Sequence, residues 1–356
     1  MHYTSAMIEL APFVVCPETL GPLVPRAAGF WSPQAECLYP VREGLVFLGY
    51  PERDRTMIEA TMAEEYEWQG TPATAARNLE WLGKSAPIAV GAINLASSFV
   101  QTTGRRAVDL GSGSGWVGWL LARAGYDTWM CDFEANSLAS GLRFQHERLG
   151  EGRRFVTDAR FAPFANETFD LVVCKEFVHH VADYPSLFQE ANRILRSDGT
   201  LLLVEPTRSI VSSLIELRRP DPHEGHEIVW LGAYREAIRQ AGFEIIHQTA
   251  AYYELSARRD RNRVAAEFKR RATRAVEGFQ AMGWLTKAHL TLMGGASAVL
   301  VCRKSSPAPT QPRPQMAVIS PTTLTITTDE RSLLGAVPEV LEKASARLVP
   351  QIPESA

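Results

Sequence analysis

The chain has 356 residues, of which 46% are hydrophobic and 22% are charged, and its formal net charge is −3. These proportions are ordinary for a globular protein, and the small net charge excludes a global attraction to nucleic acids or anionic membranes. The length exceeds that of one average domain, so we expect one large domain with extensions.

Membrane and compartment signals are weak along the chain. No apolar run reaches the roughly 18–20 residues that cross a bilayer, so we expect no membrane association. The first fifteen residues lack a basic region and a small-residue cleavage site, so we expect no signal peptide. The cysteines are scattered and odd in number, which favours a reducing, cytoplasmic location over a disulfide framework. They are Cys16, Cys37, Cys131, Cys174 and Cys302.

Four segments differ in character. Residues 1–52 hold short apolar runs broken by Pro and Gly, which predict a small β-rich module. Residues 53–104 show helical spacing over 57–68 and 73–82, which predicts a helical linker or lid. Residues 305–356 begin with a Pro-rich linker over 305–316 and continue into a tail with a helix over 329–347, interrupted by Pro338.

Between these extensions, residues 105–304 alternate strand and helix signals. Such alternation requires right-handed crossovers, so we expect an α/β fold with a doubly wound, mostly parallel, seven-stranded Rossmann-like sheet. The strands are expected at 107–110, 128–131, 154–157, 171–174, 200–205, 243–250 and 297–302, and the helices at 116–124, 135–149, 184–195 and 232–241.

A glycine-rich turn follows the first of these strands. Gly111, Gly113 and Gly115 stand at alternate positions around Ser112, and a helix comes next. Glycines allow a close backbone approach to a ligand, and a helix N-terminus presents free N–H groups. Gly113, Gly115 and Gly118 also fit the dinucleotide pattern, so the turn alone leaves the cofactor open.

Acidic residues favour one cofactor. Asp109 precedes the turn, and its carboxylate would repel a pyrophosphate and attract the ammonium and sulfonium of S-adenosylmethionine, by a few kcal/mol at an effective dielectric of about 20. Asp132 ends the second strand, where it can accept from ribose hydroxyls, with Phe133 beside it. Asp158 ends the third strand, placed to accept from the adenine amino group.

These stretches resemble the class I methyltransferases, and most of all the subgroup that includes ubiquinone and menaquinone pathway enzymes. The resemblance is strong over about 105–205 and looser to 304. It implies that Gly111, Gly113 and Gly115 surround the methionine moiety, that Asp132 holds the ribose, and that Asp158 and Ala159 flank the adenine. Lys175 and Glu176 would border the sulfonium. The matching stretches are 108–115, 130–132, 158–164, 168–180 and 190–201.

The N-terminal module resembles a small zinc-ribbon-like family that activates tRNA and protein methyltransferases. The match covers roughly 13–50, including Cys16-Pro17 and Tyr39-Pro40. A structural zinc site needs four ligands, commonly in paired C-x2-C motifs. Here only Cys16 and Cys37 remain, and Thr19 stands where a paired cysteine would be, so we expect a metal-free module.

Candidates for the chemistry follow the fourth and fifth strands. His179 and His180 lie next to the expected methyl position, and either can act as a general base, with His180 favoured. Glu205 ends the fifth strand and is a further candidate for base or substrate ligand. His226 and Glu227 lie in a polar segment where this fold often inserts substrate-binding elements.

The preferred interpretation is S-adenosylmethionine-dependent methyl transfer to oxygen or carbon of a small molecule, such as a sugar or secondary metabolite. The N-terminal module and a basic, amphipathic segment over 258–279 leave a methyltransferase acting on RNA or protein as an alternative. Two further alternatives are a non-catalytic scaffold and a dinucleotide oxidoreductase. A homodimer also stays open.

Overall fold

A computed structural model describes residues 8–56, 72–100, 105–141, 148–150, 152–210, 228–252, 296–318 and 336–349. Within these ranges no helix has both the length and the apolar character to cross a membrane. His226, Glu227, the basic segment over 258–279 and the expected helix over 57–68 lie outside the described residues.

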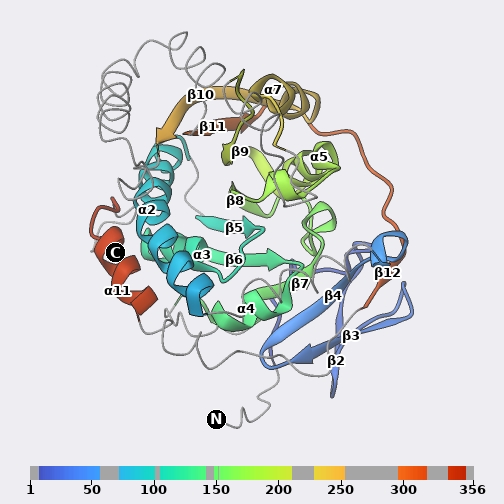
Figure 1. The fold of residues 1–356 in the computed structure, drawn as a ribbon. Helices are drawn as coiled ribbons and strands as arrows, with labels where there is room; N and C mark the ends of the chain where they lie inside the picture. Colours follow the sequence, from blue (N-terminus) through green and yellow to red (C-terminus); the bar gives the residue numbers. More distant parts are fainter. Residues whose placement is uncertain are drawn as a thin grey trace, which may run out of the picture.

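Seven neighbouring strands of a sheet that has twelve strands among the described residues form the centre of the molecule (Figure 1), and this α/β architecture confirms the predicted fold class. Their order is β7-β6-β5-β8-β9-β11-β10, with β11 antiparallel to both of its neighbours and the others parallel. The strands are β5 (Arg106–Leu110), β6 (Asp127–Asp132), β7 (Arg154–Thr157), β8 (Phe169–Lys175), β9 (Leu195–Pro206), β10 (Phe243–Tyr252) and β11 (Ala296–Lys304).

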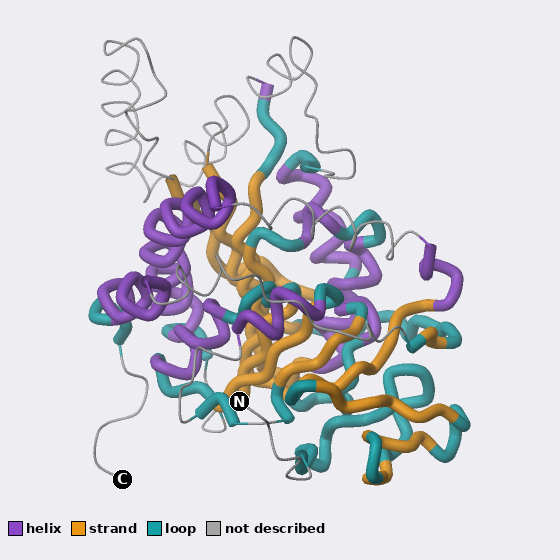
Figure 2. Tube along the Cα trace, turned by 60° about the horizontal axis from the view of Figure 1, so that its bottom comes forward, coloured by secondary structure: helices purple, strands orange, loops and turns teal. Residues whose placement is uncertain are grey.

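Helices cover both faces of this sheet, as Figure 2 shows from a second direction. One core packs α2 (Pro72–Ser97), α3 (Trp116–Arg123), α4 (Ala135–Gly141) and α11 (Ala336–Ser345) onto one face. The other core packs α5 (Tyr184–Ile194) and α7 (Leu231–Gln240) onto the opposite face. The central strands are apolar on both faces because both are buried.

The helix predicted over 73–82 is the start of a much longer one. Helix α2 continues through Pro87 to Ser97. A proline removes one backbone hydrogen bond from a helix, but here Leu82, Ala86 and Val90 bury one side of α2 against the sheet. The described part of the tail helix α11 runs from Ala336 to Ser345 and includes Pro338, so the proline does not interrupt it there.

The N-terminal module is β-rich, as predicted, but it is continuous with the main sheet. Strands β1 (Val24–Arg26), β2 (Gly29–Ser32), β3 (Cys37–Arg42) and β4 (Leu45–Pro51) form an antiparallel series. Strand β4 then pairs in parallel with β7, which places Val46 opposite Phe155. The module therefore extends the sheet next to the third of the predicted strands.

The Pro-rich segment predicted as a linker is a strap fixed to the surface of the domain. Residues 305–317 run along α5, where Asn192 Nδ2 donates to the Ser306 carbonyl at 3.0 Å. Arg313 forms an ion pair of 2.6 Å with the fully buried Glu190. The strap ends in β12 (Met316–Ala317), which pairs antiparallel with β4. Its prolines are compatible with an extended conformation, and the order comes from these distant partners.

Candidate active site

The glycine turn is held open at the carboxyl edge of β5. Its backbone is bonded to β6, because the N–H groups of Gly111 and Ser112 both donate to the Cys131 carbonyl, at 2.9 and 3.0 Å. Gly111 has a φ of 71°, and a Cβ there would lie 1.9 Å from the Phe177 ring. Gly113 has a φ of 51°, but a Cβ there would meet no atom within 4 Å. The turn thus packs on Phe177 at one point and faces open space at the next.

Asp132 binds this turn directly. Its Oδ2 accepts from Gly113 N at 2.7 Å and its Oδ1 from Glu134 N at 2.9 Å, and the residue is only 7% exposed. Burial raises the pKa of Asp132 to about 6, against the lowering effect of these backbone donors. A carboxylate so placed has remaining lone pairs for the two hydroxyls of a ribose.

Asp109 has a different position from the one expected. It stands one residue before the end of β5, is 1% exposed, and its Oδ2 accepts from Gly118 N of α3 at 3.1 Å. Burial raises the pKa of Asp109 to about 8. The carboxyl group therefore lies beneath the turn and fastens α3 to β5. The electrostatic preference assigned to Asp109 is weakened accordingly, and its role toward a cofactor stays a prediction.

The three acids are also staggered and not level with one another. Asp132 of β6 lies opposite Val156 of β7, so Asp158 is two residues closer to the carboxyl edge of the sheet than Asp132. Asp109 of β5 lies opposite Met130 and is therefore two residues further from that edge than Asp132. The Asp158 carboxylate accepts hydrogen bonds from the backbone N–H and from the guanidinium of Arg160, whose Nη2 lies 2.6 Å from Asp158 Oδ2. The same Nη2 lies 2.6 Å from Asp54 Oδ2. Asp158 is thus already paired, and its role toward adenine, like that of Ala159, stays a prediction.

Strand β4 and the short turn after it contribute two residues to the site that no sequence motif indicated. Tyr50 at the end of β4 is buried, and its hydroxyl donates to the Phe133 carbonyl at 2.6 Å. This fixes the backbone directly after Asp132. Asp54 reaches Asp158 through Arg160. Neither residue belongs to a local motif, and only the pairing of β4 with β7 brings them here.

His179 and Glu205 form a buried pair on the other side of the turn. Glu205 is fully buried, and its Oε1 accepts from the backbone N–H groups of Phe177 and Val178 at 2.6 and 2.7 Å. Its Oε2 lies 2.8 Å from His179 Nδ1. Both histidines belong to a short 3₁₀ turn, and the His180 ring lies 4.2 Å from that of His179 in a more exposed position.

Lys175 and Glu176 lie together at the end of β8. Lys175 Nζ is 3.0 Å from Glu176 Oε1, and the Lys175 side chain is 1% exposed. Burial lowers the pKa of Lys175, and burial also raises the pKa of Glu176. Glu176 has a φ of 51°, a left-handed backbone that is unusual for a non-glycine residue and frequent at functional sites.

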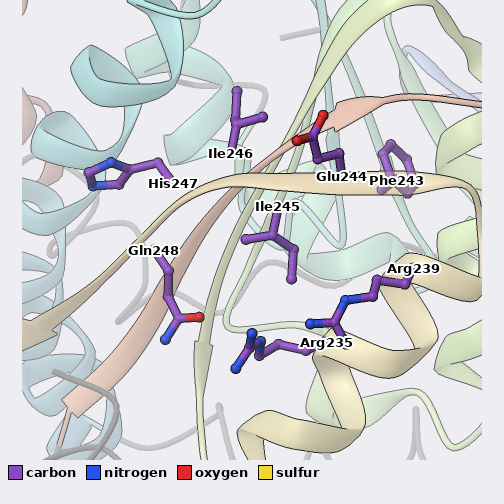
Figure 3. A pocket seen from close by; sticks show the side chains of 8 residues that line it. All are labelled: Arg235, Arg239, Phe243, Glu244, Ile245, Ile246, His247 and Gln248. Carbon is purple, nitrogen blue, oxygen red and sulfur yellow. The ribbon is translucent and has the colours of Figure 1, made fainter. Parts of the chain in front are cut away.

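A separate pocket of about 490 Å³ lies on the outermost strand of the sheet (Figure 3). Arg235 and Arg239 of α7 point toward Gln248 of β10 there, and His247 points to the other side of the strand. His247 and Gln248 lie near the middle of β10. Strand β10 runs parallel to β9, so only its end near Tyr252 reaches the carboxyl edge of the sheet, where the glycine turn lies. The pocket is therefore remote from the glycine turn.

The N-terminal module holds Cys16 and Cys37, the two cysteines of the zinc-ribbon resemblance, and neither forms a disulfide. Cys16 Sγ is 3.3 Å from the Tyr39 hydroxyl. Burial raises the pKa of Cys16, but hydrogen bonds from Ser32, Thr19 and Tyr39 outweigh it and lower that pKa. The described residues hold no group of three or more His, Cys, Asp or Glu side chains suited to a metal ion. The absence of zinc stays a prediction.

A doubly wound sheet with a glycine turn and an acid at the end of the next strand defines a nucleoside-cofactor domain. Residues 108–203 match the family model of a methyltransferase domain. This segment of the chain is therefore similar to the methyltransferase domain of the class I methyltransferases, the class of enzymes whose cofactor is S-adenosylmethionine.

Individual relatives leave the methyl acceptor undetermined. A ubiquinone biosynthesis O-methyltransferase of Methylococcus capsulatus is 30% identical over 128 residues, which are 35% of this chain and 54% of that protein. Phosphoethanolamine N-methyltransferase 3 of Arabidopsis thaliana is 22% identical over 162 residues, 44% of this chain and 33% of that protein. The chain thus spans about half or less of these relatives.

One solved structure is a complex between the Haloferax volcanii Trm112 methyltransferase activator and a methyltransferase. It is 18% identical, covers 66% of this chain and 96% of that chain, and has a TM-score of 0.46. A score this low adds nothing to the assignment.

Proposed function

We propose that this protein transfers a methyl group from S-adenosylmethionine to an oxygen or carbon of a small-molecule acceptor. The observation that carries the proposal is the pairing of Asp132 with the open side of the glycine turn, opposite the His179–Glu205 pair. The first provides a site for the nucleoside, and the second provides a base for the acceptor.

The residues around the turn fit the cofactor. The Ser112 hydroxyl is buried and has no hydrogen-bond partner among the described residues, as expected for a group that meets a ligand. The α3 N-terminus follows Gly115 and has no side-chain cap, so its N–H groups can receive a carboxylate. When bound, S-adenosylmethionine supplies an electrophilic methyl group on a sulfonium.

The His179–Glu205 pair supports a role in proton removal. Glu205 accepts three hydrogen bonds inside the protein, so it orients His179 and does not itself face an acceptor. With Nδ1 donating to Glu205, Nε2 of His179 is the atom that takes the proton of an acceptor hydroxyl or acidic carbon. This proposal ranks His179 above His180, the reverse of the expectation from sequence.

Tyr234 supports an acceptor site near this pair. Its residue is fully buried, and its hydroxyl has no hydrogen-bond partner within the described part of the chain. The ring packs edge-on against Tyr184 at 5.5 Å. Burial raises the pKa of Tyr234, and the negative charge of Glu205 adds to this effect. An aromatic wall with an unsatisfied hydroxyl suits an acceptor that carries a polar group.

The test is a methyl-transfer assay with S-adenosylmethionine labelled on its methyl group. The full chain is incubated with a panel of hydroxylated small molecules, and in parallel with total RNA and with a protein extract. Label in a small molecule, lost in His179→Ala, is the expected result. Label only in RNA or protein would replace this proposal by its alternative, and binding of the cofactor without transfer to any acceptor would indicate a scaffold.

A further inference from the structure

The pocket on the outermost strand of the sheet is large enough for a ligand of its own. Residues of α7 and β10 line it, and its volume is about 490 Å³ (Figure 3). This volume falls within the ~300–1,000 Å³ that sites for small molecules occupy. Because the pocket is remote from the glycine turn, a ligand bound in it takes no direct part in methyl transfer.

Two arginines of α7 face into this pocket. Arg235 and Arg239 are four residues apart, so one turn of the helix brings both side chains to the same face. Both guanidinium groups point toward Gln248 of β10 (Figure 3). Arg239 Nη1 lies 3.5 Å from Glu236 Oε2, but these side chains are 52% and 60% exposed, so solvent screens this ion pair. Two positive charges therefore meet at one side of the pocket.

The same side of the pocket holds hydrogen-bond donors that lack acceptors. Arg235 Nε and Gln248 Nε2 are buried atoms, and neither has a hydrogen-bond partner in the part of the chain that the structure describes. A buried donor without an acceptor is destabilising, so it calls for a partner from outside these residues. Guanidinium and amide nitrogens only donate. The partner that would satisfy them is a group rich in acceptor oxygens.

The carboxylate of β10 lies on the other face of the strand. Ile245 packs with the core below α5 and α7, whereas Ile246 packs with the core on the opposite face. Side chains alternate along a strand, so Glu244 is on the face away from the arginines, opposite Arg303 of β11 (Figure 3). The arginine side of β10 thus presents the Gln248 amide and the half-buried, apolar Ile245 to a ligand.

We propose that this pocket binds a small phosphate monoester. Arg235 and Arg239 bind the phosphate oxygens. Gln248 donates a further hydrogen bond, and Ile245 packs against the ester group. A phosphate monoester carries a charge of about −1.5 to −2 at neutral pH and three free oxygens, which match two guanidinium groups and one amide donor. A carboxylate has one charge and two oxygens, so it matches this set less well. The proposal does not rest on the proposed function, because the pocket shares no residue with the glycine turn.

The experiment is calorimetric titration of the full chain with phenyl phosphate, inorganic phosphate and benzoate. Phenyl phosphate should bind saturably and about tenfold more tightly than the other two, since inorganic phosphate lacks the apolar group and benzoate lacks the second charge. In Arg235→Gln, the affinity for phenyl phosphate should fall about 10- to 100-fold, because charge-assisted hydrogen bonds are lost. In Arg239→Gln it should fall by a smaller factor, since that side chain is 52% exposed.

Controls separate a built site from a general effect of charge. Arg303→Gln removes the same charge from the other face of this sheet edge, and it should leave the affinity for phenyl phosphate unchanged. Arg235→Lys keeps the charge without the planar fork, and it should still weaken binding if Arg235→Gln does not fold. Saturation with S-adenosylhomocysteine should have no effect.

Four results would each overturn the proposal. They are equal losses in Arg235→Gln and Arg303→Gln, equal affinity for phenyl phosphate and inorganic phosphate, displacement of phenyl phosphate by S-adenosylhomocysteine, and no saturable binding to the wild-type chain at millimolar concentrations. None of the four bears on whether the chain binds S-adenosylmethionine, so the proposed function is tested separately.

Discussion

Gly111 and Gly113 of the same turn should respond differently to substitution by alanine. In Gly111→Ala the new Cβ lies 1.9 Å from Phe177 Cγ, at a φ of 71°. The left-handed backbone costs about 1–2 kcal/mol and the overpacking about 1–3 kcal/mol more. We therefore expect the free energy of unfolding to fall by about 2–5 kcal/mol in Gly111→Ala.

Gly113→Ala should lower the free energy of unfolding less than Gly111→Ala does, but it should strongly weaken cofactor binding. Its Cβ meets no atom within 4 Å, so only the backbone strain of about 1–2 kcal/mol applies. However, the methyl group points into the space that we assign to the cofactor. We expect S-adenosylhomocysteine to bind at least about tenfold more weakly, a change of about 1.4 kcal/mol.

Urea unfolding and calorimetric titration measure the two effects. Phe177→Ala in the wild-type and Gly111→Ala backgrounds provides the control, with a coupling of about 1–3 kcal/mol expected because the two residues are in contact. Unchanged affinity in Gly113→Ala would show that the open side of the turn does not face the cofactor. A loss of stability in Gly113→Ala as large as in Gly111→Ala would refute the packing described for Phe177.

Three further results are expected. Glu205→Gln should lower turnover about 10- to 100-fold with little change in cofactor affinity, because His179 loses the acceptor that orients it; unchanged turnover in a steady-state assay would remove this role. Arg313→Ala should lower the free energy of unfolding by about 1–3 kcal/mol, because it leaves the buried Glu190 with one cation fewer; an unchanged urea midpoint would show that the strap adds no stability. Cofactor affinity should fall as pH drops through about 6, since protonation of Asp132 weakens its bonds to ribose, and Asp132→Asn should lose this dependence in titrations from pH 5 to 8.

The raised pKa of Asp132 also affects the stability of the protein without a ligand. The pKa of Asp132 in the folded chain exceeds that of an exposed aspartate, so the folded state binds more protons between about pH 4 and 6. Protonated Asp132 therefore stabilises the folded chain at about pH 4, and this stabilisation is lost as the pH rises to about 6. Ligand affinity and stability of the free chain should therefore change in opposite directions over this range.

The central strands were predictable because their signal is local. Each is a short run of apolar residues, such as Leu171 to Cys174, that is buried on both faces by helices of the same domain. The pairing of β4 with β7 was not predictable, since Val46 and Phe155 are more than a hundred positions apart. The strap was misjudged for the same reason, because its prolines suggest a flexible linker and its partners Glu190 and Asn192 lie on a distant helix.

The candidate site likewise contains residues that a local sequence signal predicts and residues that only the folded sheet brings together. The glycine turn and Asp132 were recognisable from spacing, and both lie together at the carboxyl edge. The burial of Asp109 follows from strand alternation, which puts its side chain on the opposite face from Val108 and Leu110 and toward α3. That signal was present in the sequence. Tyr50 had no such signal, because only the folded sheet brings it to Phe133.

The central claim is that the glycine turn and Asp132 bind a sulfonium nucleoside and not a dinucleotide. Calorimetric titration of the full chain with S-adenosylmethionine and, separately, with NAD tests it most directly. We predict saturable binding of S-adenosylmethionine, weakened by about 1–3 kcal/mol in Asp132→Ala, and no measurable binding of NAD. Binding of NAD in preference to S-adenosylmethionine, or full affinity for S-adenosylmethionine in Asp132→Ala, would contradict it.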